Sequence, residues 1–100
     1  MNDALIKSIM DKGIKNIDAS MFPPQQREEI FMEVGKRFLN MGKSTDAFIA
    51  FDIAGKLPPI ETCKTLAKNH LEIGNRDIAA FIYEKIGEKQ LADFIRKNKI

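Results

Sequence analysis

The feature that most constrains this chain is an internal repeat with a period of 32 residues. Residues 31–56 and residues 63–88 share glycines, small residues and aromatic residues when one stretch is shifted onto the other. The matched pairs are Gly42 with Gly74, Gly55 with Gly87, Leu39 with Leu71, Ala47 with Ala79, Phe51 with Tyr83, and Gly35 with Ala67. A helix–turn–helix unit that recurs at this length is typical of helical solenoids, in which each unit buries its apolar face on its neighbours.

Helical periodicity runs along nearly the whole chain, and glycine and proline punctuate it. The pattern predicts six helices, over residues 3–17, 24–41, 44–54, 58–73, 75–86 and 88–98. Ser44 or Thr45 is expected to cap the third helix and Asn75 the fifth, while the four glycines of the repeat end the helices before them. Short connections place consecutive helices antiparallel and in contact. The expected fold class is therefore all-α, in one domain that spans residues 1–100.

Residues 28–61 carry the signature positions of one tetratricopeptide repeat, and the chain resembles that family here. The matching residues are Phe31, Val34, Gly35, Phe38, Ala47, Phe51, Ala54 and Pro59. Residues 63–88 match more loosely, because His70 replaces an aromatic residue and Ile86 a small one. The alternative is a generic antiparallel bundle whose spacing matches by chance.

The resemblance implies a right-handed superhelix of antiparallel helix pairs. It divides the chain into an N-terminal capping helix and loop (1–22), a first helix pair (23–57), a second, degenerate pair (58–87) and a C-terminal helix (88–100).

In the tetratricopeptide family the first helix of each pair lines a concave groove that holds the ligand. The resemblance thus implies a module that binds a partner protein or peptide, without the lysine–asparagine clamp of the chaperone-binding subclass. The implied partner-binding residues are Met32, Lys36, Leu39, Lys64, Lys68, Leu71 and Arg96. Cations capture carboxylates and leucines supply desolvated area, so such a groove suits an acidic peptide. The alternative is that the lysines are ordinary solvated side chains.

Two other functions stay open from the sequence. The chain could be a structural subunit or a homodimer of a larger assembly, because Leu5, Ile6, Ile9 and Met10 form an apolar strip that either caps the stack or dimerises. A helical nucleic-acid binder is the third hypothesis, and it rests on a pI of about 8.7 and a basic tail. The formal net charge of only +2 disfavours it.

No residue pattern predicts catalysis, a metal or a cofactor. His70 is the only histidine and Cys63 the only cysteine, so neither a nucleophilic triad nor a zinc ligand set is available. The stretch Gly42–Thr45 resembles the end of a phosphate-binding loop, but it lacks the required glycine spacing and a preceding strand. The single cysteine favours a reducing compartment, and the apolar runs are too short to span a membrane. We therefore expect a cytoplasmic protein that is not an enzyme.

Overall fold

The computed structural model describes residues 3–98. Over this range the secondary structure consists of six α-helices and two short 3₁₀ helices. The all-α class with about six helices is therefore confirmed. The chain divides into two compact units, a first unit of residues Met1–Leu57 and a second unit of residues Pro58–Ile100. The division falls where the sequence predicts the first helix pair to end.

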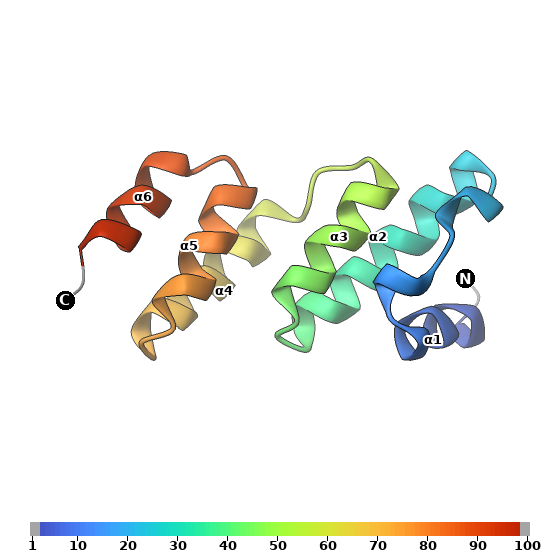
Figure 1. Cartoon of the computed structure of the whole chain (residues 1–100), viewed down its shortest axis with the longest axis horizontal. Coiled ribbons are helices and arrows are strands. Elements are labelled where there is room, and N and C mark those ends of the chain that lie inside the picture. Colours follow the sequence, from blue (N-terminus) through green and yellow to red (C-terminus); the bar gives the residue numbers. More distant parts are fainter. Residues whose placement is uncertain (1–2, 99–100) are drawn as a thin grey trace. The chain divides into compact units, whose positions relative to one another are not determined.

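The first unit contains three α-helices, of which α2 and α3 lie side by side and antiparallel (Figure 1). Its elements are α1 (Asp3–Lys12), the 3₁₀ helices Ile14–Asn16 and Ala19–Met21, α2 (Pro24–Asn40) and α3 (Ser44–Ala54). The predicted extension of the first helix to Ile17 is wrong. Gly13 adopts a φ of 93°, which takes the backbone out of the α-helix after Lys12.

The α2–α3 interface depends on a close approach at Gly35. The ring of Phe51 lies so near that a Cβ on Gly35 would be only 2.4 Å from its Cε1 atom. Phe48 packs edge-to-face against Phe51, with 5.8 Å between the ring centroids. Phe31 and Val34 of α2 are fully buried in the same core. The small residue at position 35 thus allows an aromatic side chain to pack directly on a helix backbone.

Helix α1 is bound to α2 by both apolar and ionic contacts. Ile6 and Ile9 are buried, and the guanidinium of Arg37 lies 2.7 Å from a carboxylate oxygen of Asp3 and 3.2 Å from one of Glu33. These two carboxylates raise the pKa of Arg37 further above its ordinary value, Asp3 having the larger effect. The first helix therefore belongs to the core of the first unit.

The second unit is built from α4 (Ile60–Glu72), α5 (Arg76–Lys85) and α6 (Lys89–Lys97). Helix α5 packs against both α4 and α6 (Figure 1). A small core of Ala80, Ala92 and Ile95 is covered by the half-buried Leu71 and Tyr83. All three helices thus contribute to one apolar centre.

Arg76, at the start of α5, is hydrogen-bonded to the C-terminal end of α6. Its guanidinium donates a hydrogen bond of 2.7 Å to the carbonyl oxygen of Ile95 and a second one to that of Asn98. The last carbonyls of a helix have no partner within the helix and carry partial negative charge, so a guanidinium is well matched to them.

The 32-residue repeat is also a repeat of backbone hydrogen bonds. Each of the four helix-ending glycines of the repeat has a φ between 70° and 90°. In each turn the residue after the glycine donates to the carbonyl five residues earlier, which is the Schellman pattern. The donor–acceptor pairs are Lys43–Phe38, Asn75–His70, Lys56–Phe51 and Glu88–Tyr83. The predicted helix ends at these glycines are therefore confirmed.

The predicted side-chain caps are not formed. Neither α3 nor α5 has a side-chain hydrogen bond at its N-terminus. The Ser44 hydroxyl is buried without a partner among the described residues. The amide Nδ2 of Asn75 lies 3.2 Å from Nδ1 of His70 instead. In both turns the backbone, held by the glycine, sets the start of the next helix.

Candidate functional site

An open pocket lies in the second unit, and we call it the α4–α6 pocket. Its lining residues come from α4, α5, α6 and the turn before α6: Lys64, Thr65, Lys68, Tyr83, Glu88 and Leu91. Its volume is about 340 Å³, at the lower end of the range for ligand pockets in proteins. It opens to solvent beside Lys64 and Lys68, two of the partner-binding residues that the tetratricopeptide resemblance implies.

The charged groups of the α4–α6 pocket are not paired with one another. Lys64 and Lys68 are four residues apart on α4, so their side chains leave the same face of the helix. Neither lysine, nor Glu88, forms an ion pair with any residue between positions 3 and 98. Two ammonium groups and one carboxylate are therefore free to contact a ligand.

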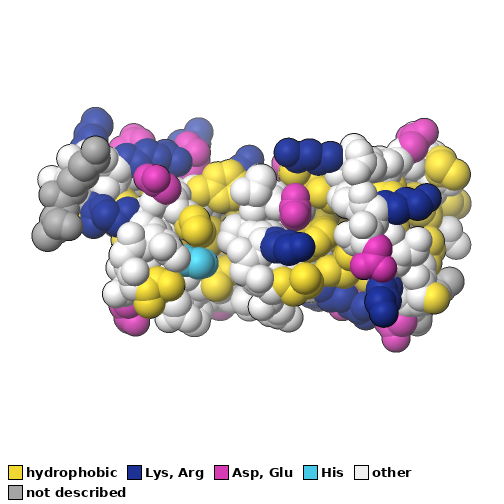
Figure 2. Space-filling model, turned by 60° about the horizontal axis from the view of Figure 1, so that its bottom comes forward, with side chains coloured by type: hydrophobic (Ala, Val, Ile, Leu, Met, Phe, Trp, Pro, Cys, Tyr) yellow, Lys and Arg dark blue, Asp and Glu magenta, His cyan; other side chains and the backbone are white. Residues whose placement is uncertain are grey.

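Apolar surface adjoins these charges along α6. Leu91 is 39% exposed at the pocket, and Phe94 is 58% exposed one turn further on. Residues three apart are neighbours on a helix surface. On the face drawn in Figure 2, exposed hydrophobic side chains lie among charged ones. The pocket and its surroundings thus offer both ionic and apolar contacts.

The repeat pairs Tyr83 of the pocket with a buried aromatic residue of the first unit. Its counterpart in the first unit, Phe51, lies on Gly35 and is only 1% exposed. The residue that corresponds to Gly35 is Ala67, and a methyl group at position 35 would collide with the Phe51 ring. Tyr83 is half-buried; it packs on the core of Ala80, Ala92 and Ile95 and also lines the pocket. The two units thus differ both in the exposure of this aromatic residue and in the residue at the position of Gly35.

Of the predicted residues in the second unit, the structure brings Lys64 and Lys68 together at the pocket. Leu71 is half-buried and packs on the core. The expectation that Arg96 continues the same surface is wrong. Arg96 follows Leu91 by five residues, roughly 140° around the helix, and lines a separate cleft near the start of α5.

Arg96 is also paired within the chain. Its two terminal nitrogens each lie 3.3 Å from a carboxylate oxygen of Glu84. This guanidinium lowers the pKa of Glu84. A partner at Arg96 would have to compete with that carboxylate.

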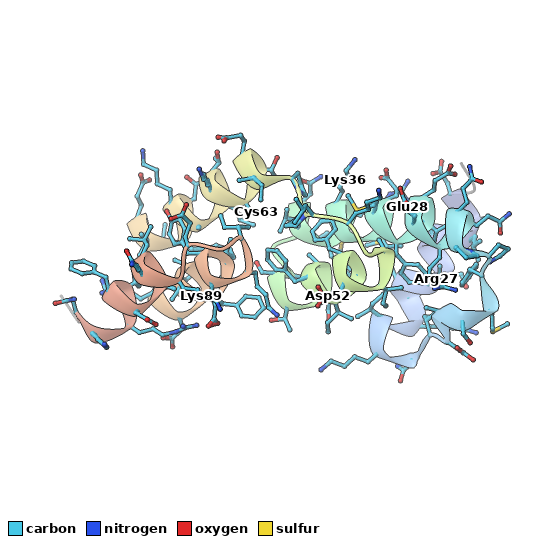
Figure 3. All side chains as sticks on the ribbon, turned by 90° about the horizontal axis from the view of Figure 1, so that it is seen from above. Arg27, Glu28, Lys36, Asp52, Cys63 and Lys89 are labelled. Atoms are coloured by element: carbon cyan, nitrogen blue, oxygen red, sulfur yellow. The ribbon has the colours of Figure 1, made fainter. Side chains whose placement is uncertain are left out.

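The predicted residues of the first unit have different exposures. Lys36 is exposed and projects from α2 on the side away from α3 (Figure 3). Met32 is half-buried. Leu39 is only 2% exposed, so its prediction as a partner-binding residue is wrong. It lies four residues after Gly35 and shares the stripe of α2 that packs on α3.

The prediction that Ile6 and Ile9 belong to a dimer face is wrong. Ile6 and Ile9 are enclosed within the first unit. Leu5 and Met10 are half-buried. The apolar strip of α1 is used by the fold of its own unit, as the capping alternative expected.

The residues with potential chemistry lie apart. Cys63 is buried in α4, and burial raises the pKa of its thiol to about 11, so the reactive thiolate is scarce near neutral pH. His70 has a buried Nε2 atom with no hydrogen-bond partner among residues 3–98. Within the described part of the chain, no group of three or more potential ligands could hold a metal ion. No described helix is long and apolar enough to cross a membrane.

Sequence reasoning missed Glu88 and Leu91 as pocket residues. Both stand at the start of α6, and the signal was available. Glu88 follows Gly87 directly, so α6 begins without the Pro58-Pro59 linker that precedes α4. A helix that restarts so soon keeps its first turn beside the preceding helix.

No family model matches this chain, and neither a curated protein nor a solved structure matches it. The resemblance of residues 28–61 to a tetratricopeptide repeat stays a prediction from the sequence.

Proposed function

We propose that this chain is a non-enzymatic, tetratricopeptide-like adaptor of the cytoplasm that binds a segment of another protein in the α4–α6 pocket. The observation that carries the proposal is the pocket itself, where Lys64 and Lys68 stand beside Tyr83 and Leu91 with their charges unpaired. Unpaired cations next to accessible apolar surface suit a carboxylate on an apolar peptide.

The pocket's openness favours transient binding. Ion pairs that remain in contact with water contribute little each, because solvent screens them and both side chains lose rotamer freedom. The apolar part is small, one leucine and one tyrosine edge, so a ligand gains only modest area. We therefore expect weak, salt-sensitive capture of a short segment rather than a permanent complex.

A random peptide library displayed on phage tests this function. The wild-type chain should enrich peptides that contain an acidic residue next to apolar ones. The double variant Lys64→Glu/Lys68→Glu should lose those peptides, because repulsion replaces attraction at the pocket. Circular dichroism should show unchanged helicity, since both side chains are exposed.

The matched control is Lys7→Glu/Lys43→Glu, which makes the same change in net charge at two exposed lysines of the first unit. This control should keep the enriched peptides. Equal retention of the peptides by the Lys64→Glu/Lys68→Glu variant would refute binding at the α4–α6 pocket.

One observation favours the alternative of a structural subunit or homodimer, namely the exposed Phe94 on α6. The nucleic-acid alternative gains no such support. Glu88 places a carboxylate in the pocket, where it would repel a phosphate backbone.

A further inference from the structure

We propose that the α4–α6 pocket selects a peptide segment that carries a carboxylate and a basic side chain together, with an apolar residue near them. This inference rests on the proposed function, since it names the ligand class of the same pocket. It starts from the distribution of charge: Lys64 and Lys68 come from α4, whereas Glu88 comes from the turn before α6.

The carboxylate of Glu88 has no role within the fold that would account for it. Glu88 stands at the N-terminal end of α6, but its side chain makes no capping hydrogen bond. It also pairs with no cation in the described range of the chain. The helix dipole stabilises an acid near a helix N-terminus slightly. This interaction does not use the hydrogen-bonding capacity of the carboxylate oxygens.

The backbone of Glu88 is held by hydrogen bonds on both sides, which fixes the point from which its side chain leaves the main chain. Its amide donates a hydrogen bond of 2.8 Å to the Tyr83 carbonyl, and its own carbonyl accepts one of 3.0 Å from the Ala92 amide. A ligand therefore orders only the side chain of Glu88 and not its backbone, which limits the freedom lost on binding. Glu88 is therefore suited to act as a specificity-determining residue.

The charge pattern discriminates between ligands by sign. A purely acidic segment would gain from Lys64 and Lys68 but would meet repulsion from Glu88. A purely basic segment would gain from Glu88 but would meet repulsion from Lys64 and Lys68. A segment with both charges satisfies all three residues, and the apolar surface of Tyr83 and Leu91 accepts the residue beside them.

Three short peptides with blocked termini test the inference, because their only charges are then on side chains. All share one apolar core; the first carries a glutamate and a lysine, the second a glutamate and a glutamine, and the third a glutamine and a lysine. Each is made in both sequence orders. Titration of the ¹⁵N-labelled full chain by NMR measures the dissociation constants and shows which amides respond.

The mixed-charge peptide, in its better order, should bind about two- to fivefold more tightly than the acid-only peptide, the range of one exposed ion pair. Glu88→Gln should remove this preference, and Glu88→Lys should reverse it in favour of the acid-only peptide. Asp93→Asn is the matched control, because it removes one exposed carboxylate from α6 outside the pocket lining. It should leave the preference unchanged.

The experiment distinguishes a failure of this inference from a failure of the proposed function. If the acid-only peptide binds the wild-type pocket as tightly as the mixed-charge peptide, the inference is overturned and the proposed function stands. The same holds if Glu88→Gln keeps the wild-type preference. If none of the peptides perturbs the amides of Lys64, Lys68 and Leu91, the inference and the proposed function are both overturned.

Discussion

At the scale of single residues, the two helix pairs differ at one repeat position, which is Gly35 in the first unit and Ala67 in the second. Gly35 admits the Phe51 ring onto the backbone of α2. In the second unit Ala67 stands at the equivalent position, and Tyr83, the counterpart of Phe51, remains partly in solvent. The two positions are equivalent in the repeat, so each can be tested by exchanging its residue for the other.

Gly35→Ala should destabilise the chain by about 1–3 kcal/mol, because the new methyl group collides with a buried ring that has no space to move. The gain in helix propensity from glycine to alanine, about 1 kcal/mol, offsets only part of this cost. Thermal or urea unfolding followed by circular dichroism measures the change.

Lys36→Ala controls for a change of residue on the same turn of α2, because Lys36 is exposed. It should alter stability by less than about 0.5 kcal/mol. A Gly35→Ala variant as stable as wild type would contradict the close approach described for Phe51.

Ala67→Gly should have the opposite structural effect in the second unit. Without the methyl group, the Tyr83 ring can move towards α4 and fill part of the pocket. NMR should then show new contacts between the Tyr83 ring and the α4 backbone, together with weaker binding of the peptides that the wild-type pocket selects.

Ala4→Gly provides the control, because Ala4 is an exposed helical alanine of α1. It makes the same change of residue without touching the pocket, although Ala4 lies in the first turn of α1 and so loses less than the roughly 1 kcal/mol of a helix interior. Unchanged Tyr83 contacts in Ala67→Gly would show that another residue holds the ring outward.

At the scale of elements, α6 is the helix on which the site depends, because it supplies one wall of the pocket. It is short, and its buried face consists mainly of Ala92 and Ile95. Much of its attachment must therefore come from polar contacts: the hydrogen bonds of Arg76 to the carbonyls at its end, and the ion pair of Arg96 with Glu84.

Arg76→Met tests that attachment, since methionine keeps the apolar stem and removes the donors. Loss of the hydrogen bonds to Ile95 and Asn98 should cost about 1–3 kcal/mol, the range for bonds made by charged groups. Hydrogen exchange of the α6 amides should accelerate while that of α2 and α3 stays the same.

Arg96→Met is the comparison variant. It breaks a solvent-exposed ion pair, so its effect should be smaller. Equal exchange rates in Arg76→Met and wild type would mean that apolar packing alone retains α6.

The elements themselves were predictable because glycine and proline act locally. The glycines that end four helices, and Pro24 at the start of α2, need no tertiary information. The end of α1 at Gly13 was missed because Ile14 and Ile17 continue the apolar period beyond the helix. The side-chain caps failed because the preceding Schellman turns already direct the backbone.

The site was predictable only in part, since lining a pocket depends on how helices pack. Lys64 and Lys68 were predicted from the resemblance to a tetratricopeptide repeat, in which the first helix of each pair lines the groove. Arg96 was misplaced because the rotation of α6 about its axis is set by Ala92 and Ile95, the residues it buries. Glu88 was missed although the direct connection from Gly87 to α6 indicates that α6 starts beside the preceding helix.

At the scale of the whole molecule, the exposed apolar surface on α6 bears on oligomeric state. Leu91 and Phe94 are the exposed large apolar residues of that helix. Two side chains supply far less than the roughly 1,000 Å² that a stable interface needs. The other exposed large apolar residues of the described range come from separate segments of the chain: Met21, Met41, Leu57, Ile73 and Ile78. The apolar strip of α1, which first suggested a dimer, is occupied within its own unit.

We therefore expect light scattering to give the mass of a single chain, 11.3 kDa. A larger species that Phe94→Gln returns to the monomer would favour the homodimer alternative instead. Asp93→Asn, on the same helix, serves as the control that should leave the measured mass unaltered.

The chain has one tyrosine and no tryptophan, and that tyrosine belongs to the pocket. Tyrosine emission, excited at wavelengths where phenylalanine does not absorb, consequently originates in the second unit alone, whereas the far-ultraviolet dichroism sums helices from both units. Denaturation recorded by the two signals on the same unlabelled sample will coincide if the units melt as one cooperative block, and will diverge if each melts by itself.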